Sequence, residues 1–368
     1  MKTLLEEALS RDDKPVSTAP AVNEDMRADT ELESLLAEMK TKVRIFGCGG
    51  SGCNTIARMM EEGIAGAELF AANTDAQHLL ATPAPKKILL GRRVTKGLGA
   101  GALPQIGEEA ARENEEDIRK FLHGSDMVFV TCGLGGGTGT GGSHVITKLA
   151  KDAGALTVAF VTLPFKGEGL LRMENAEWGL EKLRQTADTV VSIPNDRLLD
   201  LVPRLSLNAA FRFADEVLVR AIKGLAEVIT KPGLVNLDFN DIRTIMQGAG
   251  VAMIGLGESD AVGEDRAVEA LTEAIESPLL DVDVSDARGV LVNVTGGNDM
   301  TVSEAEKVVE EIQDRVNPNA RIIWGASVDP TLEHTLKVML IVTGVRSKQI
   351  LGKTSSADGK KMGVDVVR

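Results

Sequence analysis

The glycine-rich stretch TCGLGGGTGTGG, residues 131–142, constrains this chain more than any other segment. It follows an apolar run, Asp126–Cys132, that predicts a buried strand, and it precedes helical spacing of apolar residues over Ser143–Ala150. Glycine adopts positive φ angles without strain, so such a loop lets the backbone come close to a ligand. Its N–H groups and the helix N-terminus then form an anion site for a di- or triphosphate. The residues expected there are Gly135, Gly136, Gly137, Thr138, Gly139, Thr140 and Gly141.

Two other interpretations of this loop fit its position less well. A flexible glycine linker is the simplest alternative, but linkers seldom join a buried strand to an amphipathic helix. A Walker P-loop is excluded, because no Gly-Lys-Ser/Thr sequence follows at the required spacing.

The composition limits the classes of function. A net charge of −13, from 41 basic and 54 acidic residues, argues against nucleic acid or anionic lipid as a main partner. Any phosphate would then be held largely by backbone amides and metal. Aromatic residues make up only 3% and tyrosine is absent, so stacking platforms for single-stranded nucleic acid are not expected.

Length and cysteine content set further bounds. With 368 residues and 43% apolar residues, the chain has room for about two domains plus tails. No apolar run approaches membrane-spanning length, so direct membrane insertion is not expected. The polar, acidic N-terminus does not look like a secretory signal, which makes the cytoplasm the expected location. Cys48, Cys53 and Cys132 are too few for a disulfide framework and form no metal-binding pattern.

A second glycine loop, Gly47–Gly52, follows the predicted strand Lys42–Phe46 and enters a helix. It satisfies the GxGxxG pattern, and Asp75 follows the next predicted strand, Glu68–Ala72, as in a dinucleotide-binding unit. An NAD-dependent oxidoreductase is therefore a serious alternative. The number of glycine loops weakens it, because a dinucleotide-binding half needs only one phosphate loop.

Further strand–loop–helix units continue the pattern. Gly97–Ala102 lies between a predicted strand, Lys86–Leu90, and a predicted helix, Pro104–Leu122. Repeated units of this kind predict a parallel sheet with its ligand at the carboxyl ends of the strands, where the loops gather.

Two more units place polar residues at the same edge of the sheet. Glu168 and Arg172 follow a predicted strand at Ala155–Val161, and Asn195 follows another at Thr189–Ile193. A surface ion pair is the simpler explanation for Glu168 and Arg172, and the residue pattern alone favours it.

A long helix is predicted over Leu207–Thr230, apolar around much of its circumference like a helix buried between two domains. Asp215 and Glu216 interrupt its apolar face. A carboxylate there can accept both the N1–H and the 2-amino hydrogens of guanine, which adenine cannot supply together. An ordinary solvated charge is the alternative, and spacing does not exclude it.

Polar residues gather again after this helix, where Asn236, Asp238 and Asp241 lie close in sequence. Asp238 suits a helix N-cap, which is the structural alternative for at least one carboxylate. Paired carboxylates can instead orient a water for attack on a phosphate. The preceding helix is roughly 35 Å long, so these residues do not reach the nucleotide of their own chain. Chemistry there needs a second subunit, which favours a polymer over a monomeric enzyme.

The region that follows carries no glycine-rich phosphate loop, and support and interface are its expected roles. Its predicted strands are Val251–Leu256, Gly289–Val294, Arg321–Ser327 and Leu336–Val345, and its predicted helices are Asp265–Glu276 and Ser303–Val316.

Together these motifs resemble the FtsZ family, the prokaryotic tubulin homologues of cell division. Gly135–Gly141 matches the tubulin-type signature small-Gly-Gly-Thr-Gly-small-Gly, and the likeness extends from about residue 42 to 345 in family order. The resemblance implies that further nucleotide contacts come from Gly49, Gly50, Ser51, Asn54, Asn73, Thr74, Asp75, Gly99, Ala100, Gly101, Pro164, Glu168, Arg172, Asn195, Phe211 and Asp215.

The resemblance also implies a function. Asn195 and Asp215 match positions near the ribose and guanine, and Asp215 looks archaeal. Asn236, Asp238 and Asp241 match the catalytic synergy loop, whose aspartates activate the GTP of the neighbouring subunit. By implication the protein is a GTPase that uses GTP/GDP and Mg²⁺, polymerises head to tail and forms the division ring at mid-cell. No protein ligand to the metal is named.

The implied fold is α/β: a Rossmann-like parallel-sheet GTPase domain, a long central helix and a second, smaller α+β domain, as in tubulin and FtsZ. The expected segments are a mobile N-terminal extension (1–40), the GTP-binding domain (41–206), the connecting helix (207–230), the synergy loop (231–242), a support domain (243–346) and a flexible tail (347–368).

The end of the chain departs from the bacterial pattern, because it lacks the usual terminal peptide. The valine-rich end Val364–Val367 is instead expected to bind an archaeal membrane-anchor or division protein. An archaeal tubulin-like cell-shape protein is a closer alternative than a dehydrogenase. A filament protein that binds GTP without hydrolysing it is a further one.

Overall fold

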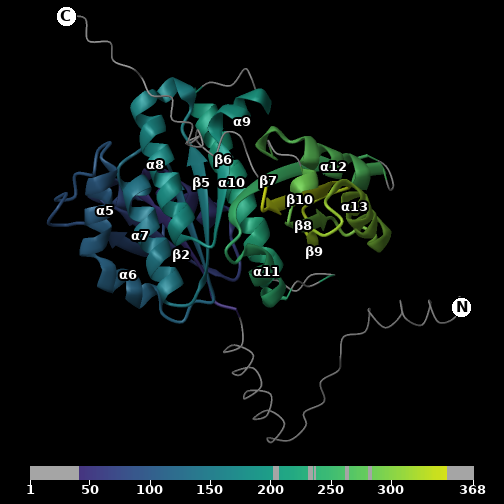
Figure 1. Ribbon diagram of the computed structural model, residues 1–368, viewed down its shortest axis with the longest axis horizontal. Coiled ribbons are helices and arrows are strands. Elements are labelled where there is room, and N and C mark those ends of the chain that lie inside the picture. The colour runs from purple at the N-terminus through teal and green to yellow at the C-terminus, as the bar shows by residue number, and fades with distance from the viewer. Residues whose placement is uncertain are drawn as a thin grey trace, which may run out of the picture. The chain divides into compact units, whose positions relative to one another are not determined.

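The computed structural model (Figure 1) describes residues 41–201, 207–230, 235, 238–261, 265–280 and 284–345. The expected N-terminal extension, Asn236 and the C-terminal tail lie outside these residues.

Strands and helices alternate along the chain. The first part contains β1 (Val43–Cys48), α3 (Gly49–Glu62), β2 (Ala67–Asn73), α4 (Ala76–Ala81), β3 (Lys86–Leu89), α5 (Pro104–Glu113), α6 (Glu115–Leu122), β4 (Met127–Gly133), α7 (Thr138–Asp152), β5 (Leu156–Leu163), α8 (Leu170–Thr186), β6 (Thr189–Pro194) and α9 (Asn195–Leu201). The second part contains α10 (Leu207–Thr230), α11 (Phe239–Met246), β7 (Gly250–Ser259), α12 (Asp265–Glu276), β8 (Gly289–Gly296), α13 (Val302–Arg315), β9 (Arg321–Val328) and β10 (Leu336–Thr343).

One ten-stranded sheet runs through both parts, in the order β3-β2-β1-β4-β5-β6-β7-β10-β8-β9. All pairings from β3 to β7 are parallel, whereas β10 is antiparallel to both β7 and β8. The predicted parallel sheet is therefore confirmed. The strand order reverses between β1 and β4, and in such sheets ligands bind in the crevice at that switch point.

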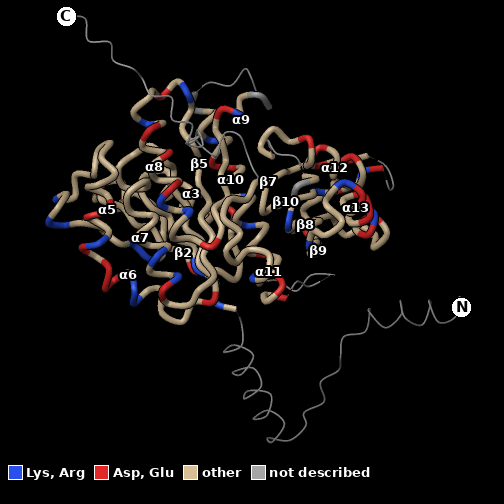
Figure 2. Tube along the Cα trace, in the orientation of Figure 1, with Lys and Arg blue, Asp and Glu red and all other residues tan. Residues whose placement is uncertain are grey.

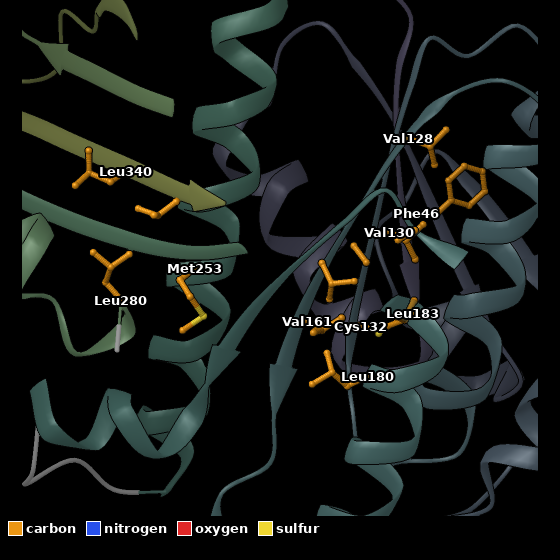
Figure 3. Close-up of a cluster of buried hydrophobic side chains, with 14 of the residues drawn as sticks. Phe46, Val128, Val130, Cys132, Val161, Leu180, Leu183, Met253, Leu280 and Leu340 are labelled. Atoms are coloured by element: carbon orange, nitrogen blue, oxygen red, sulfur yellow. The ribbon is translucent and has the colours of Figure 1, made fainter. Parts of the chain in front are cut away.

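The central strands are buried on both faces. Met127 and Phe129 of β4 pack with α3 and α10 on one face, whereas Val128 and Val130 pack with α7 and α8 on the other. Figure 3 shows part of the second cluster, in which Val128 and Val130 lie on the same side of the sheet as Leu183. Strands β4, β5 and β6 contain no charged residue, whereas acidic residues are frequent on α12 and α13 (Figure 2).

The predicted helix over Pro104–Leu122 is wrong in one respect, because it is divided into α5 and α6 at Asn114. The Oδ1 atom of Asn114 accepts a hydrogen bond from the N–H of Gly91 at 2.8 Å. Asparagine side chains that bond to backbone groups compete with helical hydrogen bonding. This hydrogen bond to a residue distant in sequence accompanies a non-helical backbone at Asn114, with φ −106° and ψ 18°.

Helix α7 begins inside the glycine stretch, at Thr138, and not at Ser143 as the apolar spacing predicted. Its glycines serve helix packing as well as ligand approach. A Cβ atom on Gly141 would lie 1.9 Å from the carbonyl oxygen of Pro104, because α5 packs directly on the backbone of α7. No side chain fits there.

We predict that Gly141→Ala lowers the free energy of unfolding by about 1–3 kcal/mol, since the added methyl group must push α5 away from α7. Urea denaturation of the nucleotide-free protein measures this. Gly167→Ala is the control, because a Cβ at Gly167 meets nothing within 4 Å. Equal stability of the two variants would contradict the packing argument.

Candidate nucleotide site

A cavity of about 270 Å³ opens beside the loops that follow the parallel strands. Most of the predicted nucleotide residues that line it come from four glycine- or proline-containing loops and the start of α10. The predicted residues in its lining are Gly50, Ser51, Gly101, Gly136, Gly137, Thr138, Gly139, Pro164, Glu168, Arg172, Asn195, Phe211 and Asp215.

A larger cavity, about 910 Å³, lies along α10, α12 and β10. Its lining includes many carboxylates, among them Glu216, Glu269 and Glu273, and none of the glycine loops. Carboxylates repel phosphate, so the smaller cavity is the candidate site for a nucleotide.

One end of the smaller cavity is built almost entirely from backbone. Gly49 has φ +76°, and a Cβ atom there would lie 2.7 Å from the amide nitrogen of Gly139. The loops after β1 and β4 are therefore in backbone contact. Gly136, Gly137 and Thr138 enter α7 at this point, so the positive end of the helix dipole faces the cavity. This arrangement suits a phosphate group.

Several predicted nucleotide residues lie outside the cavity lining, and some of them hold its loops by hydrogen bonds. The hydroxyls of Thr74 and Thr138 are 2.6 Å apart, and the carbonyl of Thr74 accepts from the N–H of Gly99 at 3.2 Å. The carboxylate of Asp75 caps α4 by accepting from the N–H of His78 at 3.0 Å. The predicted residues outside the cavity lining are Gly49, Asn54, Asn73, Thr74, Asp75, Gly99, Ala100, Gly135, Thr140 and Gly141.

The other end of the cavity is more polar and aromatic. Asn195 is only 5% exposed, and its Oδ1 atom has no hydrogen-bond partner among the described residues. Phe211 packs edge-to-face against Phe165, with ring centroids 5.2 Å apart. An aromatic ring beside an unsatisfied amide suits a base and a sugar better than a phosphate.

Asp215 lies at this same end and carries a perturbed charge. Burial raises the pKa of its carboxyl group to about 6, although Arg58 opposes the shift. The Nε atom of Arg58 lies 3.6 Å from Oδ2 of Asp215. At neutral pH the carboxylate is ionised and can accept two hydrogen bonds from a bound base.

Glu168 and Arg172 form the ion pair that the sequence suggested, with Oε2 of Glu168 2.6 Å from Nη1 of Arg172. The other carboxylate oxygen of Glu168 accepts from the N–H of Phe165 at 2.9 Å. Both members of the pair also line the cavity. Glu168 and Arg172 thus form a surface ion pair and also line the candidate site.

Sequence analysis missed four residues of the cavity lining: Gly133, Leu134, Thr162 and Ala214. Gly133 and Thr162 lie at the carboxyl ends of β4 and β5 and are register partners. The rule that ligands bind at the carboxyl ends of parallel strands would have indicated both.

Asp238 and Asp241 lie far from this cavity. Asp238 is the N-cap of α11 and accepts from the N–H of Asn240 at 2.9 Å, which confirms the structural alternative for this residue. Asp241 lies in the first turn of α11 and is exposed. Between them and the cavity runs α10, with 24 residues and a length of about 36 Å. Figure 1 shows α9 and α11 toward opposite ends of α10.

Comparison with known proteins identifies the family. The model of the Tubulin/FtsZ family GTPase domain matches residues 42–203, and that of the FtsZ family C-terminal domain matches residues 250–346. Cell division protein FtsZ 1 of Archaeoglobus fulgidus is 58% identical over 368 residues, which cover all of both chains. This chain belongs to the FtsZ family. The predicted resemblance and fold are confirmed.

Other family members agree. Cell division protein FtsZ of Haloferax mediterranei is 57% identical, over 92% of this chain and 90% of its own. The structure described as an empty FtsZ dimer of M. jannaschii has a TM-score of 0.83 and 53% identity, covering 88% of this chain and 93% of that chain. CetZ2 of Haloferax volcanii, at 22% identity and a TM-score of 0.73 over 84% of this chain and 95% of its own, shares the fold alone.

Family membership decides between a GTPase and an NAD-dependent oxidoreductase. The loops at the β1–β4 switch point belong to a GTPase domain, so the chain is a GTPase that binds GTP and GDP. The NAD-dependent alternative rested on the GxGxxG loop. That loop instead forms one wall of a cavity to which several other loops contribute.

The pKa of Asp215 predicts how GTP affinity depends on pH. If guanine donates hydrogen bonds to this carboxylate, they favour its ionised form, and the bound group would have a lower pKa than the free group, whose pKa is about 6. Affinity should therefore fall as pH drops below about 6, approaching tenfold per pH unit.

Titration of GTP between pH 5 and 8 into wild type and Asp215→Asn measures this dependence. Protonation of the GTP phosphates affects both proteins equally and cancels in the ratio of their affinities. The ratio of the wild-type affinity to the Asp215→Asn affinity should decline toward low pH. A ratio that is constant over the whole range would contradict a role for the carboxylate.

Proposed function

We propose that this protein is a cell-division GTPase that assembles head to tail and hydrolyses GTP between subunits. One observation carries the proposal: the cavity and the exposed Asp238 and Asp241 lie toward opposite ends of α10. A site divided in this way is completed when the α11 end of one subunit meets the cavity of the next. Translation along one direction repeats the contact and produces a filament.

Properties of relatives support this reading. The relatives from A. fulgidus and H. mediterranei are named as cell division proteins. The M. jannaschii protein, 53% identical, has been solved as a dimer. We infer that this chain also self-associates and that its filaments form the division ring at mid-cell.

The cavity suggests how GTP is oriented. Its glycine-lined end would hold the phosphates through the backbone amides of Gly136 to Gly139 and the start of α7. Its other end would hold guanosine, with Asn195 at the ribose and Phe211 beside the base. Asp215 would accept from N1–H and the 2-amino group of guanine. Predicted residues outside the lining, such as Thr74 and Asp75, would act by fixing the loops.

Catalysis would use the neighbouring subunit's aspartates to orient the attacking water. Asp238 and Asp241 are exposed at the start of α11, as residues that meet another subunit must be. The third proposed member of this group, Asn236, lies outside the described residues. A filament protein that only binds GTP would have no need of these acidic residues.

Mg²⁺ is the metal that we expect with GTP, where it would neutralise part of the phosphate charge. Within the described residues, no group of three His, Cys, Asp or Glu side chains is placed to hold a metal ion. Mg²⁺ often keeps several waters and binds substrate phosphates, so we name no protein ligand to it.

The tail would supply the link to other division components. Among the described helices, none combines the length and apolar character that a membrane crossing requires. We propose that the valine-rich end Val364–Val367, which lies outside the described residues, binds a membrane-anchor or division protein. Deleting residues 358–368 should abolish anchor binding and leave GTPase activity intact; unchanged binding would refute this role.

We predict that Asp238→Ala and Asp241→Ala each retain GTP binding and filaments but lose most GTP turnover. Each variant removes a carboxylate that orients water while leaving the cavity of its own chain unchanged. Phosphate release, GTP affinity and sedimentation of filaments measure the three properties. Asp314→Ala, which removes an acidic residue from the distant helix α13, is the matched control. Wild-type turnover in both aspartate variants would refute the assigned role.

A further inference from the structure

Asn175, a half-buried residue of α8, joins the loop before α5 to the loop after β4. Its Nδ2 atom donates to the carbonyl oxygen of Ala102 at 3.0 Å and to that of Gly135 at 3.3 Å. A side-chain amide nitrogen has two hydrogens. Both are used, one for each loop.

The two loops also contact each other directly beside the cavity. The N–H of Gly137 donates to the carbonyl oxygen of Gly101 at 2.9 Å. A Cβ atom on Gly137 would lie 2.5 Å from that oxygen, so the loop backbones are as close as they can be. Gly101 and Gly137 both line the cavity. The width of the cavity at its glycine end therefore depends on how these loops are held together.

Helix α8 is well placed to hold them. One turn before Asn175, the carbonyl oxygen of Arg172 lies 3.0 Å from the position a Cβ would take on Gly135. Arg172 itself lines the cavity. The first turns of α8 thus pack against the loop after β4. The amide of Asn175 in addition donates hydrogen bonds to both loops.

We propose that Asn175 is a positioning residue that sets the spacing of the two glycine loops and so tunes the affinity for the phosphates of GTP. The inference rests on the proposed orientation of the nucleotide. Asn175 is absent from the cavity lining, so it acts through the loops and not by contact with the ligand. Base recognition, at the other end of the cavity, should not depend on it.

Asn175→Asp tests this with little change in shape. A carboxylate has no hydrogens to donate and places negative charge against two carbonyl oxygens. The two loops should then separate. GTP affinity should fall about tenfold, whereas the affinity for guanosine, which has no phosphate, should change less than twofold. Asn175→Ala removes the donors without adding charge and should lower GTP affinity about threefold.

The experiment is equilibrium binding of GTP and guanosine to the full-length protein and its variants. Gln185→Glu is the control, because it adds the same charge to α8 about 15 Å further along the helix. Selective loss for GTP in both Asn175 variants, but not in the control, supports the proposal. Unchanged GTP affinity, or equal loss for GTP and guanosine, overturns it. Failure of the wild-type protein to bind GTP would instead refute the proposed function.

Discussion

The loops that follow β1 and β4 meet where the strand order reverses, and their backbones touch with no side chain between them. A Cβ atom on Gly52 would lie 2.5 Å from the carbonyl oxygen of Thr131, and one on Gly49 would lie 2.7 Å from the nitrogen of Gly139. This contact brings the N-terminus of α7 to the cavity and leaves room for a phosphate. The glycine content of these segments and the candidate anion site both depend on this close approach.

The acidic character of the chain makes that backbone site more important. With a net charge of −13, the protein attracts no anion at long range. The charged side chains in the cavity lining are Glu168, Arg172 and Asp215, and the first two neutralise each other. Phosphate binding would therefore depend on amides and the helix dipole, and the carboxylate of Asp215, paired with Arg58, lies at the end proposed for the base. In the proposed function, this charge distribution would orient the nucleotide.

Local patterns predicted most of the fold, because burial of apolar strands and helical periodicity can be read within a short window. The long helix predicted over Leu207–Thr230 is present as α10 over the described residues of this segment. Effects of distant contacts were missed. The break at Asn114 accompanies a hydrogen bond to Gly91, and the early start of α7 depends on packing against α5. The role of Asn175 was likewise invisible, since its two partners lie 73 and 40 residues away. The nucleotide residues came from the family resemblance, and the structure divides them between the cavity lining and its support.

In the proposed function, each active site is completed by a second subunit. GTP hydrolysis per subunit, measured over a range of protein concentrations with light scattering on the same samples, tests it most directly. A site shared between subunits predicts a specific rate that is near zero in dilute solution and rises above a threshold together with scattering. A specific rate that is constant down to high dilution would mean that each chain carries a whole active site. In that case the role of Asp238 and Asp241 across the interface would be wrong.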